Sequence, residues 1–220
     1  MTYVSWAVLY EGATDRAYFD VLIPRVMQEL VQRFGIRLST IPSTPAVLLS
    51  RDTVEKVAKE ACKAIDAFHL CFIHADTGGR NLESKLECRS SAYCEAMRAE
   101  CNWPPARCIV IAPRKETEAW ILADGVAVTS ALGYTGLPAS IGLPLTAADA
   151  EQLADPKATL RGAIQIVRGR RGTINVDDLF PAIALRQSLD ELRSTSSFTA
   201  FEKELYLALA DIGCVRRPAA

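Results

Sequence analysis

Four acidic residues directly follow apolar runs and are the residues best placed to do chemistry: Glu11, Asp76, Glu116 and Glu118. If each run is a strand of one parallel sheet, these acids lie outside the carboxyl ends of the strands, where open α/β sheets bind their ligands. Neighbouring carboxylates repel one another unless a proton or a cation lies between them. Hard divalent ions prefer oxygen ligands, so the pattern indicates a Mg²⁺ or Mn²⁺ site.

Residues next to these acids suit phosphate chemistry. Gly12 has no Cβ and lets a phosphate approach the backbone, while the helix expected after it points its N-terminal amides at the same place. The candidate contacts for a nucleic-acid backbone are five arginines: Arg80, Arg114, Arg168, Arg170 and Arg171. The last three belong to a glycine-flanked basic segment that is equally typical of a solvated turn. If they bind phosphates, their contribution falls steeply with salt.

Each acid also has a purely structural interpretation. Acidic side chains are favoured at helix N-caps and in first turns, where they interact with free amides and the helix dipole. Glu116 and Glu118 fall in an expected first turn, and Thr14 and Asp15 are expected to be helix N-terminal residues rather than ligands. The metal hypothesis therefore depends on the joint placement of acids at several strand ends.

An alternation of strands and helices must position these residues. Strands are expected at residues 2–10, 36–41, 69–75 and 107–112, and helices at 15–34, 53–68, 82–101 and 115–123. Pro24 is expected to kink or divide the first helix. The order predicts a doubly wound α/β fold with a mostly parallel four-stranded sheet. Residues 1–124 form this expected core. Residues 125–220 form a loop at 133–144 and a helical extension packed on the core, with helices at 157–167, 177–192 and 198–212.

The composition is that of an ordinary globular protein. The chain has 220 residues and a formal net charge of -1, so a nucleic-acid partner requires a local basic patch. No basic leader and no apolar run of about eighteen residues occurs, so we expect a cytoplasmic protein without a membrane span. The seven cysteines form no Cys-x-x-Cys pair and predict reduced, mostly buried thiols. The spacings of Cys88, Cys94, Cys101 and Cys108 do not suit structural zinc.

Five motifs resemble those of TOPRIM domains and their relatives. EGATD at residues 11–15 is similar to the opening of TOPRIM domains in OLD-family nucleases, and HAD at 74–76 is similar to their aspartate motif. PRKETEAWILAD at 113–124 is the most distinctive, because it resembles the signature of an uncharacterised TOPRIM-like family related to RloB proteins. DPK at 155–157 and SFTAF at 197–201 resemble that family's helical tail.

The resemblance implies a TOPRIM-like, Rossmannoid core and Mg²⁺-dependent nuclease chemistry on DNA or RNA. Glu11 matches the glutamate that ligates metal or acts as general acid/base, Asp76 matches the first metal-binding aspartate, and Glu118 matches the acid before Ala-Trp. Relatives accompany ABC-like or AAA ATPases in anti-phage defence. We therefore expect an ATPase partner and a defence role by analogy, and the sequence leaves the oligomeric state open.

One position departs from the family pattern. Gly78 stands where the usual Asp-x-Asp pair has its second acid. Either Glu116, Glu118 or water takes that place, or the site is degraded. We favour a working metal site, because Mg²⁺ commonly binds through one or two carboxylates and several waters. The competing hypothesis is a non-catalytic binding or sensor subunit whose ATPase complex supplies the activity.

Trp120 is expected to pack in the core.

Overall fold

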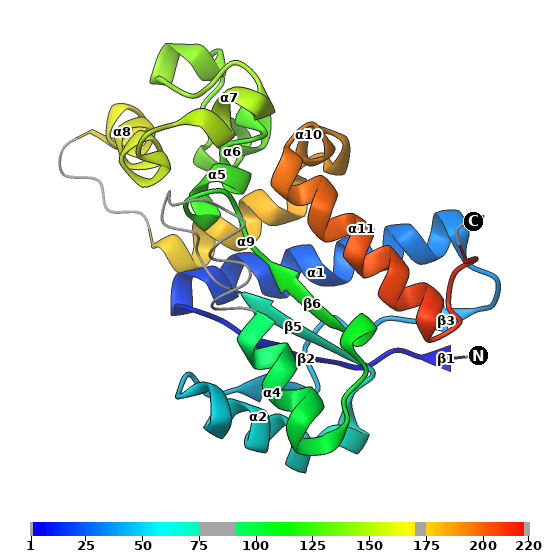
Figure 1. The fold of residues 1–220 in the computed structure, drawn as a ribbon. Coiled ribbons are helices and arrows are strands. Elements are labelled where there is room, and N and C mark those ends of the chain that lie inside the picture. Colours follow the sequence, from blue (N-terminus) through cyan, green and yellow to red (C-terminus); the bar gives the residue numbers. More distant parts are fainter. Residues whose placement is uncertain (1, 75–90, 170–174, 218–220) are drawn as a thin grey trace.

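The centre of the protein is a four-stranded parallel sheet (Figure 1), seen in a computed structural model that describes residues 2–74, 91–169 and 175–217. Its strands lie in the order β4-β2-β5-β6, with bounds Val47–Leu49, Trp6–Leu9, Leu70–His74 and Cys108–Ile111. Each neighbouring pair is parallel. This arrangement confirms the predicted α/β class with a mostly parallel four-stranded sheet.

Successive residues of β2 face two different hydrophobic cores. Trp6 and Val8 belong to the larger core, which also contains residues of α1 (Ala13–Phe34), α9 (Val176–Arg186) and α11 (Ser196–Asp211). Ala7 and Leu9 belong to a smaller core with residues of α2 (Val54–Lys63) and α4 (Ser91–Cys101). Figure 1 shows α2 and α4 on one side of the sheet and α1 and α11 on the other. A strand covered on both faces is apolar throughout, which explains the continuous runs in the sequence.

The helices that cover the sheet are α1 (Ala13–Phe34), α2 (Val54–Lys63), α4 (Ser91–Cys101), α9 (Val176–Arg186) and α11 (Ser196–Asp211). Pro24 lies buried inside α1 without dividing it, so the expected division is wrong. The remaining helical elements are η1 (Ile65–Ala67), η3 (Pro105–Arg107), α5 (Thr117–Ile121), α6 (Gly125–Leu132), η4 (Pro138–Ile141), α7 (Ala147–Gln152), α8 (Pro156–Arg168) and α10 (Leu189–Arg193). Within the described ranges, no helix is long and apolar enough to cross a membrane.

Two of the expected strands differ from the structure. The run 2–10 is broken at Val4 and Ser5, and its first part, β1 (Thr2–Tyr3), pairs with β3 (Ser39–Thr40) in a separate two-stranded sheet. The run 36–41 therefore does not enter the central sheet as expected. The fourth central strand is β4, which is only three residues long and follows a turn-like Ser-Thr-Pro sequence. Such a short edge strand gives too little pattern to be recognised.

The helical part also contains more elements than expected. The sequence analysis missed α6 and α7, which flank the Gly- and Pro-rich stretch 133–144. The expected helix 177–192 is two helices, α9 and α10, because the chain leaves helical geometry at Gln187 and Ser188. The Gln187 side chain is fully buried there, where its Oε1 accepts from the Tyr18 hydroxyl at 2.5 Å and its Nε2 donates to the Trp120 carbonyl at 2.5 Å.

Trp120 joins the sheet region to the helical part. Its ring is fully buried and makes edge-to-face contacts with Phe19 of α1 at 5.9 Å and Phe198 of α11 at 5.2 Å between centroids. Its indole N–H donates to the Ser197 hydroxyl at 2.7 Å. A buried indole N–H that finds a partner loses no hydrogen bond on folding. The expectation that Trp120 packs in the core is confirmed.

Glu151 of α7 caps α11 from outside the helix. The N-cap residue Thr195 makes no side-chain cap. Instead, the backbone N–H groups of Ser196 and Ser197 donate to the Glu151 carboxylate at 2.8 and 2.9 Å, and both serine hydroxyls donate to it as well. Burial alone raises the pKa of Glu151, but the hydrogen bonds from Ser197 and Ser196 outweigh it and hold the pKa below its ordinary value.

Two disulfide bonds correct the expectation of reduced thiols. Cys62–Cys101 joins α2 to α4, and Cys94–Cys108 joins α4 to β6. The pairs are 39 and 14 residues apart in the sequence and meet because α2, α4 and β6 enclose the smaller core. Of the described cysteines, Cys71 and Cys214 are free and buried, and burial raises the pKa of Cys71 to about 12. The cytoplasmic location stays a prediction, and the two disulfides count against it, because disulfides are rare in that compartment.

Replacing Glu151 with Gln is expected to lower the free energy of unfolding at pH 7 by about 1–3 kcal/mol, because a buried carboxylate that accepts several hydrogen bonds is lost. The pKa of Glu151 is lower in the folded protein than in the unfolded chain, where it is about 4.3, so the charged carboxylate stabilises the folded protein above that pH. This stabilisation disappears as the pH falls through the folded pKa. The deficit of Glu151→Gln relative to wild type should therefore shrink on acidification below about pH 4.

Urea unfolding of both proteins between pH 3 and pH 7 measures this deficit. Glu95→Gln removes an exposed glutamate of α4 and serves as the matched control. A deficit of Glu151→Gln that is the same at every pH would contradict the assignment of the stabilisation to the charged carboxylate.

Candidate functional site

The predicted acids that the structure describes lie beyond the carboxyl ends of β2 and β6, the strands on either side of β5. Leu9 pairs with Ile73, and His74 pairs with Ile111, so the three strands end at the same edge of the sheet. Glu11 follows β2, and Glu116 and Glu118 follow β6. Four other predicted residues lie outside the described residues: Asp76, Arg80, Arg170 and Arg171.

A buried hydrogen-bonded chain connects the ends of these strands. The Glu11 backbone N–H donates to His74 Nδ1 at 3.4 Å, and the same Nδ1 lies 3.8 Å from Asp15 Oδ2. The hydrogen bond from Glu11 favours the tautomer that carries the ring proton on Nε2. His74 Nε2 lies 3.3 Å from Thr117 Oγ1, and the Thr117 hydroxyl donates to Asp15 Oδ1 at 2.7 Å. His74 is 2 % exposed, Thr117 0 % and Asp15 8 %. Sequence reasoning did not assign these three residues to the site.

Gly12 makes room for Asp15 at the start of α1. Gly12 is the N-cap residue, in extended conformation, and Asp15 lies in the first turn. A Cβ at position 12 would lie 3.1 Å from Asp15 Oδ2. Asp15 is therefore a helix N-terminal residue, as expected, and its carboxylate gains from the free amides and dipole of α1. It is also buried in the site, which the sequence did not indicate. The expected phosphate contact of Gly12 stays a prediction.

Glu11 is half-buried and interacts with Arg51, which comes from the segment after β4. Arg51 Nη1 donates to the Glu11 carbonyl at 2.8 Å, and Arg51 Nη2 lies 3.7 Å from Glu11 Oε1. The Arg51 side chain is 67 % exposed, so this pair contributes little to stability. It does place a cation beside the first predicted metal ligand.

The turn between β6 and α5 is strained. Lys115 has a φ of 72°, in the left-handed region that few residues other than glycine adopt, and its ammonium group donates to the Leu153 carbonyl. Glu116 follows as the N-cap residue of α5. Its Oε2 is buried and has no hydrogen-bond partner among the described residues. Backbone strain and unsatisfied buried polar atoms concentrate at functional sites.

Glu118 lies on the wall of a cavity of about 160 Å³ between α1, α5, α8 and α9. The side chain is 7 % exposed, and Lys157 Nζ of α8 lies 3.9 Å from its Oε1. Lys157 and Arg161 line the same cavity. Neither cation was predicted as a site residue, although their four-residue spacing on one helix is visible in the sequence. Two of the arginines predicted from the sequence to contact phosphate are described by the structure: Arg114 is exposed in the turn before α5, and Arg168 is exposed at the end of α8.

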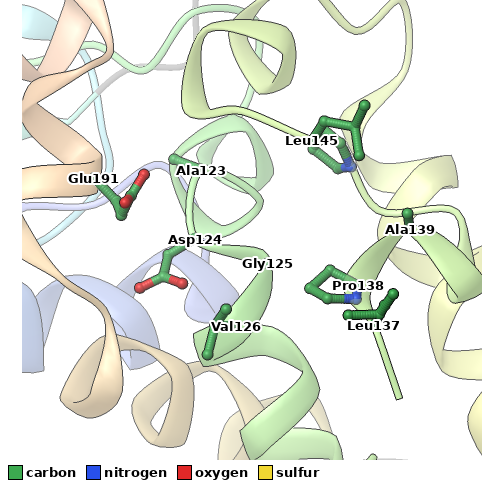
Figure 2. A pocket seen from close by; sticks show the side chains of 10 residues that line it. Ala123, Asp124, Gly125, Val126, Leu137, Pro138, Ala139, Leu145 and Glu191 are labelled. Atoms are coloured by element: carbon green, nitrogen blue, oxygen red, sulfur yellow. The ribbon is translucent and has the colours of Figure 1, made fainter.

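A second cavity, of about 280 Å³, contains none of the predicted site residues. Figure 2 shows the carboxylates of Asp124 and Glu191 on one side and Leu137, Pro138 and Leu145 on the other. Asp124 has a structural role, because its two oxygens accept from the backbone N–H groups of Ala127 at 3.0 Å and Ser188 at 2.8 Å. The candidate functional site is therefore the edge with Glu11 and Glu118.

The donor chemistry of this edge fits a hard divalent ion. Its acids supply oxygen ligands, and Glu116 Oε2 is a buried carboxylate oxygen that a cation would satisfy. The described residues include no group of three or more His, Cys, Asp or Glu side chains placed to hold a metal. Mg²⁺ does not need such a group, since it commonly keeps several waters and takes one or two carboxylates.

Comparison of the chain with family models, with curated proteins and with solved structures finds no match. The relationship to TOPRIM-like proteins therefore stays a prediction from the motifs.

Replacing Thr117 with Val removes the hydroxyl between His74 and Asp15 while keeping the shape of the side chain. We expect a loss of about 1–3 kcal/mol in the free energy of unfolding, because two buried polar groups each lose a partner. Thr117→Ser keeps the hydroxyl and should lose much less. Urea unfolding measures both changes.

The chain has only two histidines, so ¹⁵N spectra of the imidazole rings can assign the His74 tautomer. The Nε2–H tautomer is expected in wild type and in Thr117→Ser. A wild-type ring that carries its proton on Nδ1 would contradict the hydrogen-bond assignment.

Proposed function

We propose that this protein is a Mg²⁺-dependent nuclease that hydrolyses phosphodiester bonds in DNA or RNA. The observation that supports it most is the hydrogen-bonded chain Glu11–His74–Thr117–Asp15, which joins the ends of two parallel strands to the start of α5. It brings carboxylates from two chain segments, residues 11–15 and 116–118, to one edge of the sheet, next to the basic face of α8. Acids and cations together suit a metal ion and a phosphate substrate.

The acids of this edge have distinct roles in the proposal. Glu11 and Asp76 bind the metal, as the motifs imply, and Glu118 is the third ligand or orients a water. Glu116 completes the ligand set through its buried Oε2. When bound, the metal polarises the phosphate and stabilises the leaving oxygen. Thr117, His74 and Asp15 do not act on the substrate. They hold the Glu11 backbone and the start of α5 in position relative to each other.

A second candidate function is a non-catalytic binding or sensor subunit. It is favoured by the pairing of Glu11 with Arg51 at 3.7 Å and of Glu118 with Lys157 at 3.9 Å, which gives these acids cationic partners within the chain. Gly78 in place of a second acid points the same way. In this alternative, an ABC-like or AAA ATPase partner supplies the activity, in an anti-phage defence system.

Cleavage of plasmid DNA and of RNA in the presence of Mg²⁺ or Mn²⁺ tests the proposal. Wild type should cleave one of these substrates, and Glu11→Gln, Asp76→Asn and Glu118→Gln should each lower the rate about a hundredfold or more, because each removes a carboxylate ligand. Glu191→Gln removes an acid at the other cavity and should cleave at the wild-type rate. Chelation with EDTA should abolish cleavage.

Calorimetric titration of Mn²⁺ into the same variants separates the two candidate functions. The nuclease proposal expects wild type to bind Mn²⁺ and Glu118→Gln to bind it more weakly. Equal cleavage by all variants would contradict it. Wild type that neither cleaves nor binds Mn²⁺ would favour the binding subunit.

A further inference from the structure

The cavity beside Glu118 has two chemically different walls. One wall carries charge, from the side chains of Glu118, Lys157 and Arg161, and the other is apolar. The apolar wall consists of Leu160 and Ile164 from α8 and Val176 and Phe180 from α9. A site for inorganic phosphate alone has no use for an apolar wall, whereas a ligand with a ring and a phosphate uses both.

The charged wall favours an anion. Lys157 and Arg161 lie one turn apart on α8 and are both exposed, and Arg161 forms no ion pair with any described residue. Among the described residues that line the cavity, the two cations face one carboxylate, that of Glu118, so these residues together carry a net positive charge. Arg168 lies three turns beyond Lys157 on the same side of α8, which extends the basic row by about 16 Å.

The size of the cavity limits the apolar part of the ligand. Its volume of about 160 Å³ gives room for one nucleobase. Bases of a duplex are paired and stacked inside it and reach a protein pocket only when unpaired or flipped out. The pocket therefore selects a nucleotide whose base is free.

From these two walls we infer that the cavity binds one unpaired nucleotide. The base packs against Ile164 and Phe180. The phosphate of the same nucleotide binds to Lys157 and Arg161. This inference rests on the proposed function, because Glu118 belongs both to the cavity and to the proposed metal site. It adds a substrate class, namely a single strand or an unpaired strand end. A free mononucleotide has the same chemistry and is the other source of the ligand.

Fluorescence anisotropy with labelled 12-nucleotide single strands of DNA and RNA, in EDTA so that nothing is cleaved, tests this inference. The variant Lys157→Gln/Arg161→Gln should bind the preferred strand at least about tenfold more weakly than wild type. Loss of two phosphate contacts should also reduce the slope of log K against log salt by about 1.4, at roughly 0.7 per contact for single strands.

The matched control is Arg186→Gln/Lys203→Gln, which removes the same charge from exposed positions on α9 and α11 outside the cavity. It should bind almost as wild type does. A strand of abasic nucleotides should bind wild type about fivefold or more weakly than the normal strand, because the base contacts are lost. A blunt duplex of the same sequence should compete poorly, and competition by a mononucleotide identifies the free-ligand source.

Equal binding by Lys157→Gln/Arg161→Gln and its control would overturn the inference, as would equal binding of abasic and normal strands or of duplex and single strand. Strand binding that depends on Lys157 and Arg161, without any metal-dependent cleavage, would support the nucleotide site while contradicting the nuclease. Metal-dependent cleavage by wild type, together with unaltered strand binding by Lys157→Gln/Arg161→Gln, would support the nuclease while contradicting the nucleotide site. Thermal unfolding at the wild-type temperature shows that each variant is folded.

Discussion

The packing and hydrogen bonding of Trp120 hold the two parts of the chain together. Its ring contacts α1 and α11, its indole N–H donates to Ser197, and its carbonyl accepts from Gln187. Ser197 in turn donates to Glu151 of α7, so α7, α11 and the junction of α9 and α10 are tied to one residue that lies two residues after Glu118. The position of the site acids on α5 therefore depends on how the whole helical part packs.

This arrangement explains why acidic, basic and apolar side chains lie close together at the candidate site. The helices α8 and α9 are brought over the edge of the sheet by the same packing that buries Trp120. They contribute the cations Lys157 and Arg161 and the apolar side chains of the cavity, while the sheet and the start of α5 contribute the acids.

The sequence predicted those features whose signal is local. The cores of β2, β5 and β6 are apolar runs because helices cover both faces of the sheet. Glu11 comes shortly after β2, and Glu116 and Glu118 come in the turn and helix after β6. Lys157, Arg161, Arg51 and His74 were missed as site residues because their meaning depends on neighbours distant in sequence. The disulfide between Cys62 and Cys101 was missed for the same reason. Edge strand β4 and helices α6 and α7 were missed because they are short or border Gly- and Pro-rich sequence.

The two-sided burial of β2 has a consequence for the accuracy of the site. Trp6 and Val8 fit one core, while Ala7 and Leu9 fit the other. A slip of β2 by one residue would force Trp6 into the space of Ala7 and would move Glu11 by about 3.3 Å along the sheet. The volumes of these side chains thus exclude the neighbouring registers of β2. The packing of the two cores therefore fixes the position of Glu11, which lies outside both of them.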